Sequence, residues 1–97
     1  MHARVTSLSG SPGEVDAGIA DFKEKIVPFT HEQGGKGGML LVDRQTGRAL
    51  AITLWEDEQA LSASEARANE LRANVAEEMQ ATAQPTVDRY EVAVIET

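Results

Sequence analysis

Three side chains of the sequence could take part in catalysis or in ligand binding: His31, Trp55 and Tyr90. His31 stands between the expected end of a helix and a glycine-rich stretch, and imidazole titrates near neutral pH. It is therefore the candidate catalytic residue, a general base that takes a proton from a substrate. The alternative is a histidine in a solvated loop that has no part in a reaction.

Trp55, the only tryptophan, lies in the stretch ITLWEDEQAL, where a strand is expected to lead into a helix. As a substrate-binding residue, its indole would line a pocket and stack on a flat ring. The alternative is a core residue that packs on the following helix near Leu61. Tyr90 is the second candidate for substrate binding, because its hydroxyl can donate a hydrogen bond into a cleft. Packing in the core or in a subunit interface is the alternative for Tyr90.

Arg4, Arg44 and Arg89 are further candidates, because a guanidinium can hold an anionic substrate. Solvation or pairing across strands is the ordinary alternative for each of them. Residues 34–38, GGKGG, precede an expected strand and do not open a helix, so they do not predict a phosphate-binding loop. Residues 56–58, EDE, stand at an expected helix start, where the helix dipole favours acidic side chains.

The composition narrows the classes of partner and cofactor. The chain has 97 residues, no cysteine and a net charge of −7. Without cysteine neither a disulfide framework nor a thiolate metal site can form, and the two histidines lie far apart, so we expect no metal and no cofactor. The negative charge disfavours nucleic acid and anionic membranes, which bind basic surfaces. No apolar run approaches the ~20 residues of a membrane span, and we expect a single cytoplasmic domain over residues 1–97.

The elements that position these residues follow from the hydrophobic pattern. Residues 2–9 favour a strand, and a turn of glycine, serine and proline follows it. The sequence SPGE predicts a capping box between Ser11 and Glu14 at the start of a helix. Pro28 predicts the end of this helix or a kink, and Gly34 is a natural helix stop. The apolar stripe of the helix comprises Val15, Ile19, Phe22 and Ile26.

A β-hairpin and a second helix come next. Residues 38–43 and 49–55 are predicted as two strands, and Gly47 suits the left-handed position of the loop between them. Residues 56–80 are predicted as the second helix, with a kink near Ser62. The buried face of this helix comprises Leu61, Ser64, Ala68, Leu71, Val75 and Met79.

The last strand is predicted over residues 86–96. The element order β-α-β-β-α-β predicts a ferredoxin-like α+β fold with a four-stranded antiparallel sheet. The hairpin strands and the last strand are apolar on both faces, whereas two helices can cover only one face of a sheet. A second copy of the chain would cover the other face, so we expect a homodimer that forms a dimeric α+β barrel.

The segment IVPFTHEQGGKGGMLLVDRQTGRALAITLWEDEQALSAS, residues 26–64, resembles the antibiotic biosynthesis monooxygenase family of dimeric α+β barrel proteins. The features that carry the resemblance are a proline near the helix end, a glycine-rich entry to a strand, a D-x-x-T-G turn and a tryptophan followed by acidic residues. The resemblance spans about residues 2 to 96 and implies two sheets paired across a two-fold axis. It also implies a ligand cleft, in which Trp55 is the residue that matches a family site.

Some members of this family oxygenate polycyclic phenols or quinols without metal or flavin, and others degrade haem. The haem-degrading members use a histidine on the second helix and an asparagine on the first strand. Residues 57–80 contain no histidine, and the first strand offers Thr6 and Ser7 instead of an asparagine. The chain therefore departs from the haem-degrading pattern.

Two functions follow as hypotheses. The first is a cofactor-independent monooxygenase-like protein that acts on a small aromatic or quinol-type molecule in a cleft between the sheet and the helices. The alternative is a non-catalytic dimeric module that binds a small ligand or has a structural role, because the sequence contains no strong acid–base pair, metal-binding set or cofactor fingerprint. The two hypotheses differ in whether the ligand is changed by the protein.

Overall fold

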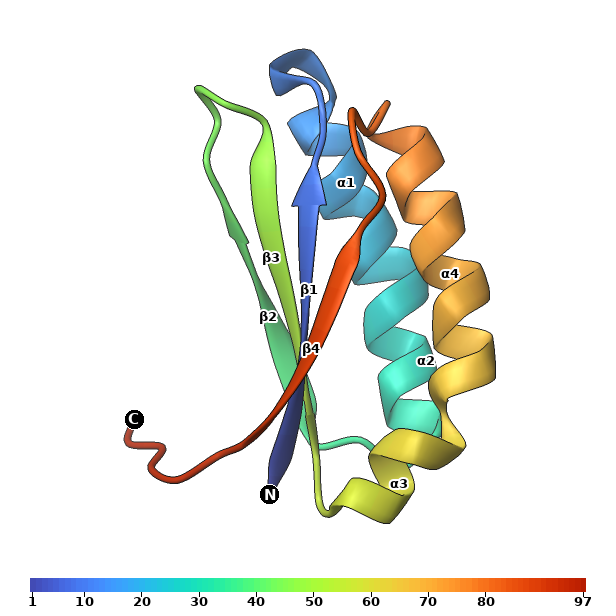
Figure 1. Cartoon of the computed structure of the whole chain (residues 1–97), viewed down its shortest axis with the longest axis vertical. Helices are drawn as coiled ribbons and strands as arrows, with labels where there is room; N and C mark the ends of the chain where they lie inside the picture. The colour runs from blue at the N-terminus through green and yellow to red at the C-terminus, as the bar shows by residue number, and fades with distance from the viewer.

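The computed structural model describes residues 1–97 and contains a four-stranded sheet with every helix on one side of it (Figure 1). The strand order is β2-β3-β1-β4, and each neighbouring pair is antiparallel. This arrangement confirms the predicted α+β class and the order β-α-β-β-α-β. The strands are β1 (His2–Ser9), β2 (Gly37–Val42), β3 (Arg48–Trp55) and β4 (Thr86–Glu91).

The pairing of β1 with β3 decides which side chains face the helices. The two strands pair along their whole length, with His2 opposite Trp55 and Arg4 opposite Thr53. Side chains alternate along a strand, and residues directly opposite each other share a face, so every second residue of both strands points to the helices. These residues are Arg4, Thr6 and Leu8 of β1 and Ala49, Ala51, Thr53 and Trp55 of β3.

The last strand is shorter than predicted. β4 ends at Glu91, so the prediction of a strand that continues to residue 96 is wrong. Glu91 lies opposite His2, where β1 begins, and beyond that point no partner strand continues beside the chain. Residues 92–97 leave the sheet (Figure 1), and Val94 and Ile95 are exposed.

The first helical segment begins with a 3₁₀ turn, η1 (Pro12–Glu14), and continues as α1 (Val15–Asp21). The predicted capping box is wrong, because the Ser11 side chain makes no capping hydrogen bond. The Glu14 N–H that a capping box would use donates instead to the Ser11 carbonyl (2.9 Å) and closes the 3₁₀ turn.

The predicted end or kink at Pro28 takes the form of a change of helix type. Phe22–Ile26 form one π-type turn, η2, after which the Val27 N–H donates to the Phe22 carbonyl five residues back. The next helix, α2 (Val27–Glu32), has Pro28 in its first turn, where a missing N–H costs little. The segment then ends at Gly34, as predicted, with a φ of 84° that suits glycine.

The hairpin between β2 and β3 is closed by Gly47, as predicted, with a φ of 81°. The second helix is divided close to Ser62, which confirms the predicted kink. Its two parts are α3 (Glu58–Ala63) and α4 (Glu65–Glu78). The cap of α3 is Asp57, whose carboxylate accepts a hydrogen bond from the Ala60 N–H (2.8 Å).

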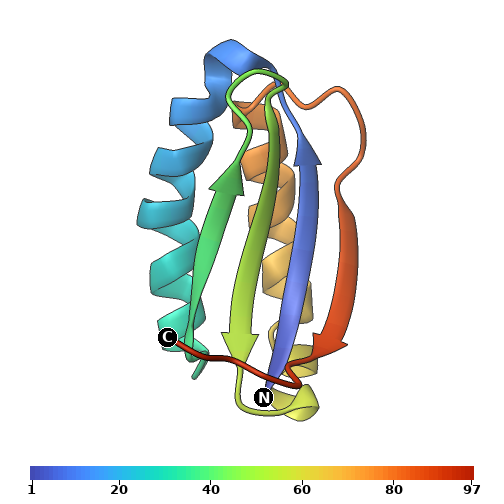
Figure 2. The ribbon, with the colours of Figure 1, turned by 90° about the vertical axis from the view of Figure 1, so that its left-hand side faces the viewer.

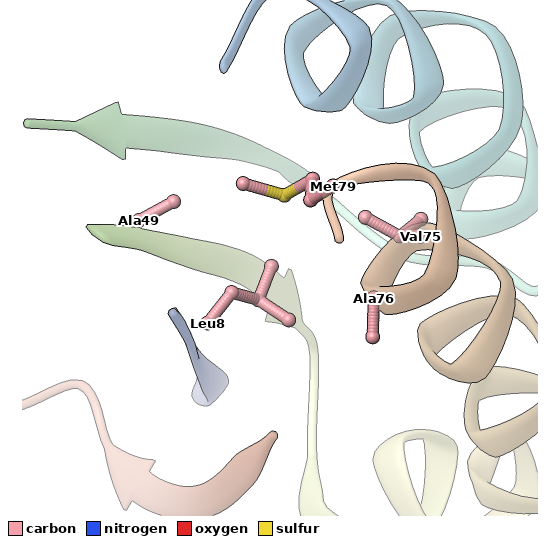
Figure 3. Close-up of a cluster of buried hydrophobic side chains, with 5 residues drawn as sticks. All are labelled: Leu8, Ala49, Val75, Ala76 and Met79. Carbon is pink, nitrogen blue, oxygen red and sulfur yellow. The ribbon is translucent and has the colours of Figure 1, made fainter. Parts of the chain in front are cut away.

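Two clusters of buried apolar side chains join the sheet to the helices. The first comprises Leu8, Ala49, Val75, Ala76 and Met79. Figure 3 shows the strand residues of this cluster facing those at the end of α4. The second comprises Phe29, Trp55, Leu61, Ala68 and Leu71. All six residues predicted for the buried face of the second helix are buried, which confirms that face.

No helix lies over the opposite face of the sheet, which we call the open sheet face (Figure 2). Leu41 and Leu50, which pair across β2 and β3, are exposed on it together with Met39. Tyr90 also points to this face, because its neighbour Arg89 faces the helices. No helix of the structure has both the length and the apolar composition that a membrane crossing requires.

Candidate functional site

A cavity, which we call the inner cavity, lies between the sheet and the helices. Its volume is about 50 Å³, and ten of its sixteen lining residues are hydrophobic. The helical side of the wall includes Phe22, Phe29, Leu71 and Met79. One water needs about 10–15 Å³, so the inner cavity can hold a few waters or the head group of a ligand. Its polar wall residues are Arg4, Thr6, Thr30, Thr53 and Arg72.

Arg4 joins the first strand to the break in the second helix. Its Nη2 donates to the Leu61 carbonyl (2.9 Å), to Ser64 Oγ (2.9 Å) and to Glu65 Oε2 (3.0 Å). The guanidinium also lies over the Trp55 ring, 5.4 Å from its centroid, where a cation–π attraction operates. Arg4 is only 4% exposed, so these contacts hold a charged group inside the protein.

Glu65 is the anion that compensates this buried charge. Besides Arg4 it accepts hydrogen bonds from Nη2 of Arg89 (2.8 Å) and Nη2 of Arg72 (3.4 Å). Burial by itself raises the pKa of Glu65, but attraction to the three arginines outweighs burial, and the pKa lies below its usual range. Burial lowers the pKa of Arg4, and Glu65 offsets only part of that effect. We call these four residues the arginine cluster.

The side-chain hydrogen bonds of Arg4 all use Nη2. Its Nε is buried and has no hydrogen-bond partner. Arg4 and Arg72 also form part of the wall of the inner cavity, whereas Arg89 does not. Most residues of the cavity wall are therefore hydrophobic, and the wall also contains two guanidinium groups.

Trp55 is completely buried and does not line the inner cavity. Its Nε1 donates to Thr53 Oγ1 (2.9 Å), and Thr53 does line the cavity. The Trp55 side chain packs in the cluster that contains Leu61, the contact named in the core alternative. Its connection with the cavity therefore passes through Thr53 and Arg4.

His31 is exposed on α2 and lines a second hollow of about 200 Å³, which we call the outer pocket. The outer pocket lies between the first helical segment and the start of β2, beside Gly37 and Gly38. The walls of the outer pocket and the inner cavity share three residues: Phe22, Thr30 and Thr53. The two hollows are therefore neighbours, with these three side chains between them.

Tyr90 is 56% exposed on the open sheet face, away from both hollows. The structure therefore brings His31 and Trp55 to the helix side of the sheet and leaves Tyr90 on the other side. Among the candidate arginines, Arg44 pairs at the surface with Asp16 (3.1 Å), far from the arginine cluster in the chain. The catalytic role of His31 and the binding roles of Trp55 and Tyr90 stay predictions.

Sequence reasoning did not single out Glu65 as a charged partner, or Arg72 and Thr53 as cavity residues. A signal for the position of Arg4 exists, because Arg4 alternates with Thr6 and Leu8 on one face of the first strand. No local signal identifies its partners, because the Arg4–Ser64 hydrogen bond joins residues 60 positions apart.

Comparison with solved structures identifies the fold. A protein from Deinococcus radiodurans that is named an antibiotic biosynthesis monooxygenase superposes with a TM-score of 0.75 at 17% identity, over 100% of this chain and 97% of that chain. The monooxygenase ActVA-Orf6 of Streptomyces coelicolor, solved in complex with nanaomycin D, has a TM-score of 0.75 at 14% identity, over 99% and 92% of the two chains. The chain has the antibiotic biosynthesis monooxygenase fold.

This monooxygenase fold also occurs in SnoaB, a cofactor-independent oxygenase from Streptomyces nogalater. The TM-score with SnoaB is 0.68 at 19% identity, over 97% of this chain and 94% of that chain. The similarity confirms the predicted resemblance at the level of the fold.

Sequence comparison gives relatives of greater length. The uncharacterised protein Rv2557 of Mycobacterium tuberculosis is 33% identical over 96 residues, which are 98% of this chain and 42% of that protein. The uncharacterised Rv2558 of the same organism is 40% identical over 73 residues, 74% of this chain and 31% of that protein. The chain thus spans less than half the length of these relatives, and no protein-family model matches it.

Proposed function

We propose that the protein is a monooxygenase-like enzyme that acts on a small aromatic or quinol-type molecule without a metal or flavin. The observation that carries the proposal is the pair of adjoining hollows, with His31 in the wall of the outer pocket and the apolar inner cavity behind it. The fold supports the same proposal, because a structure that shares it is named a cofactor-independent oxygenase.

The outer pocket is the proposed place for the aromatic ring. Its volume of about 200 Å³ exceeds the ~150 Å³ of a protein cavity that holds benzene, whereas about 50 Å³ is too small for a ring. Phe22 lines both hollows and offers an aromatic face on which a flat molecule can stack. The ring then lies beside His31, next to the wall that the two hollows share.

The proposed reaction begins when His31 takes a proton from the substrate, which leaves an electron-rich anion for attack on dioxygen. With an anthrone, two hydrogens on one ring carbon are replaced by one oxygen atom. The second oxygen atom of dioxygen leaves as water with those two hydrogens, so atoms and electrons balance. The apolar wall of the inner cavity keeps water away from the anion until oxygen reacts.

In this proposal Trp55 contributes to substrate binding indirectly. Its Nε1 donates a hydrogen bond to Thr53 Oγ1, and its ring makes a cation–π contact with the Arg4 guanidinium. Trp55→Phe keeps an aromatic ring but removes the N–H that Thr53 accepts. We therefore expect weaker substrate binding and lower activity. Tyr90 is proposed to contact a second copy of the chain, because it lies on the open sheet face.

Oxygen uptake in the presence of anthrones and hydroquinones tests the enzymatic proposal. General bases contribute about 10²- to 10⁴-fold, so His31→Ala should lower the rate at least about 100-fold. Gln33→Ala is the matched control, because Gln33 is exposed near His31 and lines neither hollow. No uptake above buffer over the whole panel would refute the proposal, and full activity of His31→Ala would refute the role of His31.

The second candidate function is a non-catalytic module that binds a small molecule or has a structural role. The observation that favours it is that no histidine, aspartate or glutamate lines the inner cavity, so that any base must act from the outer pocket. Mass spectrometry of a small molecule that co-purifies with the protein distinguishes the two functions. An unchanged molecule after incubation with oxygen favours the second function.

We also propose that the protein is a homodimer that pairs its open sheet faces. The support is the exposure of Met39, Leu41 and Leu50 on a face that no helix covers. Leu50→Glu should convert the dimer to a monomer in sedimentation velocity at micromolar concentration. Ala73→Glu, on the exposed side of α4, is the control that should leave the dimer intact. A native chain that sediments as a monomer would contradict the proposal.

A further inference from the structure

The wall that separates the inner cavity from the outer pocket is built from Phe22, Thr30 and Thr53. Hydrogen bonds hold the two threonines, because Thr30 Oγ1 donates to the Ile26 carbonyl (2.8 Å) and Thr53 Oγ1 accepts from Trp55 Nε1 (2.9 Å). Phe22 has no polar side-chain atom, so packing alone holds its ring, and the residue is buried. Phe22 is also the largest of the three side chains, so its ring supplies most of the bulk of the shared wall.

The π-type turn distributes the residues of the first helical segment between the two hollows. Phe22 begins this turn, and its carbonyl accepts the hydrogen bond of the Val27 N–H. Ile26 lines the inner cavity, whereas its neighbour Val27 lines the outer pocket. Phe22 is the only residue of the turn that lines both hollows. The backbone geometry at the turn therefore places this ring at the boundary between them.

The volume of the outer pocket fits one aromatic ring. About 200 Å³ exceeds the ~150 Å³ of a protein cavity that holds benzene, but it lies below the ~300–1,000 Å³ of pockets for drug-sized ligands. The inner cavity on the other side of the wall has a volume of only about 50 Å³. A second fused ring must therefore remain in solvent or displace the wall.

We propose that the site selects molecules with a single aromatic ring and that Phe22 sets this limit. The inference rests on the proposed function for the aromatic class of the ligand, and it adds the size of the ring system and the residue that determines it. The ring of Phe22 offers a face for stacking, and its bulk stops the ligand at the shared wall. Hydroquinones are then better substrates than anthrones, which have three fused rings.

Two fluorinated probes of different size test the limit in the native chain. They are 4-fluorophenol, with one ring, and 6-fluoro-2-naphthol, with two, and fluorine NMR measures the binding of each at a pH where both are neutral. In a site without a size limit, the additional apolar surface of the second ring should make the naphthol bind about tenfold more tightly. We expect the native chain to bind the naphthol no more tightly than the phenol, because the second ring stays in water.

Variants of two phenylalanines identify the residue that sets the limit. Phe22→Ala removes the ring from the shared wall, so the naphthol should then bind about tenfold more tightly than the phenol. Phe29→Ala is the matched control, because Phe29 is equally buried in the same helical segment but lines only the inner cavity, and it should keep the native order. Phe22→Leu replaces Phe22→Ala if circular dichroism shows that the alanine variant is unfolded, and it should shift the preference in the same direction.

A further variant locates the probes. Val27→Phe narrows the outer pocket and leaves the inner cavity unchanged, so it should weaken the binding of both probes. Full binding of both probes to this variant would overturn the inference, because the ligand would then lie elsewhere.

The inference is also overturned if the native chain binds the naphthol about tenfold more tightly than the phenol, or if neither probe binds. A folded Phe22 variant that keeps the native order, or a Phe29→Ala chain that prefers the naphthol, overturns it as well. None of these binding measurements requires turnover. The expected binding order without any oxygen uptake supports the size limit and refutes the enzymatic proposal. Oxygen uptake that is as fast with anthrones as with hydroquinones supports the enzyme and overturns the size limit.

Discussion

Glu65→Gln tests whether this carboxylate is the centre of the arginine cluster. In the native chain it accepts hydrogen bonds from Arg4, Arg89 and Arg72 at 3.0, 2.8 and 3.4 Å. Glutamine keeps the shape of the side chain but removes its negative charge, so that three guanidiniums are left close together without a counter-charge. Arg4 cannot relieve this repulsion by moving into water, because it is enclosed by the second helix and Trp55.

The expected loss follows from the exposure of the two partners. The side chains of Glu65 and Arg4 are 27% and 5% exposed. Their pair lies between an exposed ion pair, worth ~0.2–1 kcal/mol, and a buried one, whose breaking costs ~3–5 kcal/mol. We therefore expect Glu65→Gln to lower the free energy of unfolding by about 2 kcal/mol. For a chain of this length that corresponds to a Tm lower by about 8–16 °C in thermal unfolding followed by circular dichroism.

Glu70→Gln is the matched control. Glu70 pairs with Arg67 on the outer surface of α4, where the two side chains are 66% and 59% exposed. Its replacement should change the free energy of unfolding by no more than about 0.5 kcal/mol. Equal losses for Glu65→Gln and Glu70→Gln would refute the central role of Glu65.

The same substitution predicts a pH dependence. Because the pKa of Glu65 is lower in the folded chain than in the unfolded chain, its ionised form stabilises the fold. This contribution is complete above the unfolded pKa and disappears as the pH falls through the folded pKa. The difference in unfolding free energy between the native chain and Glu65→Gln should thus be constant near neutral pH and shrink below about pH 4. If the difference grew on acidification, the pKa of Glu65 would be higher in the folded chain than in the unfolded chain, opposite to the direction used in this prediction.

Two further substitutions test the packing and the capping of the helices. Gly18→Ala places a Cβ 2.7 Å from the sulfur of Met79 and should cost about 1–3 kcal/mol by overpacking, whereas Gly13→Ala, with no atom within 4 Å of its Cβ, should cost nothing. Asp57→Ala removes the hydrogen bond to the Ala60 N–H and should lower the free energy of unfolding by about 1 kcal/mol. Urea unfolding measures all three. Equal midpoints for the two glycine variants would contradict the expected overpacking at Gly18. An unchanged midpoint for Asp57→Ala would contradict the expected role of Asp57 as a helix cap.

The order of the elements could be predicted because it depends on local patterns. Runs of residues that favour strands, bounded by glycine and other turn residues, mark the strands, and the apolar spacing of the second helix identifies its buried face without knowledge of the sheet. Gly34 and Gly47 were also predictable, because both stand at turns that require a positive φ. The end of β4 was not predictable from its own residues, because the position of His2 on the neighbouring strand decides it.

One local prediction failed where two hydrogen-bonding patterns compete for the same donor. At Ser11 the side-chain cap and the 3₁₀ turn both need the Glu14 N–H, and the backbone carbonyl is the acceptor in the structure. The π-type turn at Phe22–Ile26 leaves no mark in the sequence, because only the hydrogen bond from Val27 to Phe22 distinguishes it from an α-helix.

The candidate site could be predicted only in part. The sequence identified Arg4 as one of three arginines that could hold an anion, and His31 as a residue near the helix end. The partners of Arg4 depend on where the break between α3 and α4 lies above the sheet, which is a property of the assembled fold. The positions of Phe22, Thr30 and Thr53 also depend on the assembled fold, because these residues line both hollows only when the helices pack on the strands.

The position of Trp55 gives this protein a built-in optical reporter. The chain has one tryptophan, and its ring is shielded from solvent and lies 5.4 Å from the charged group of Arg4. Indole emission responds to nearby charge, so a molecule that draws Arg4 towards itself alters the fluorescence of this single residue. Occupancy of the neighbouring hollow can therefore be followed by emission intensity and wavelength in the native chain, with no label attached.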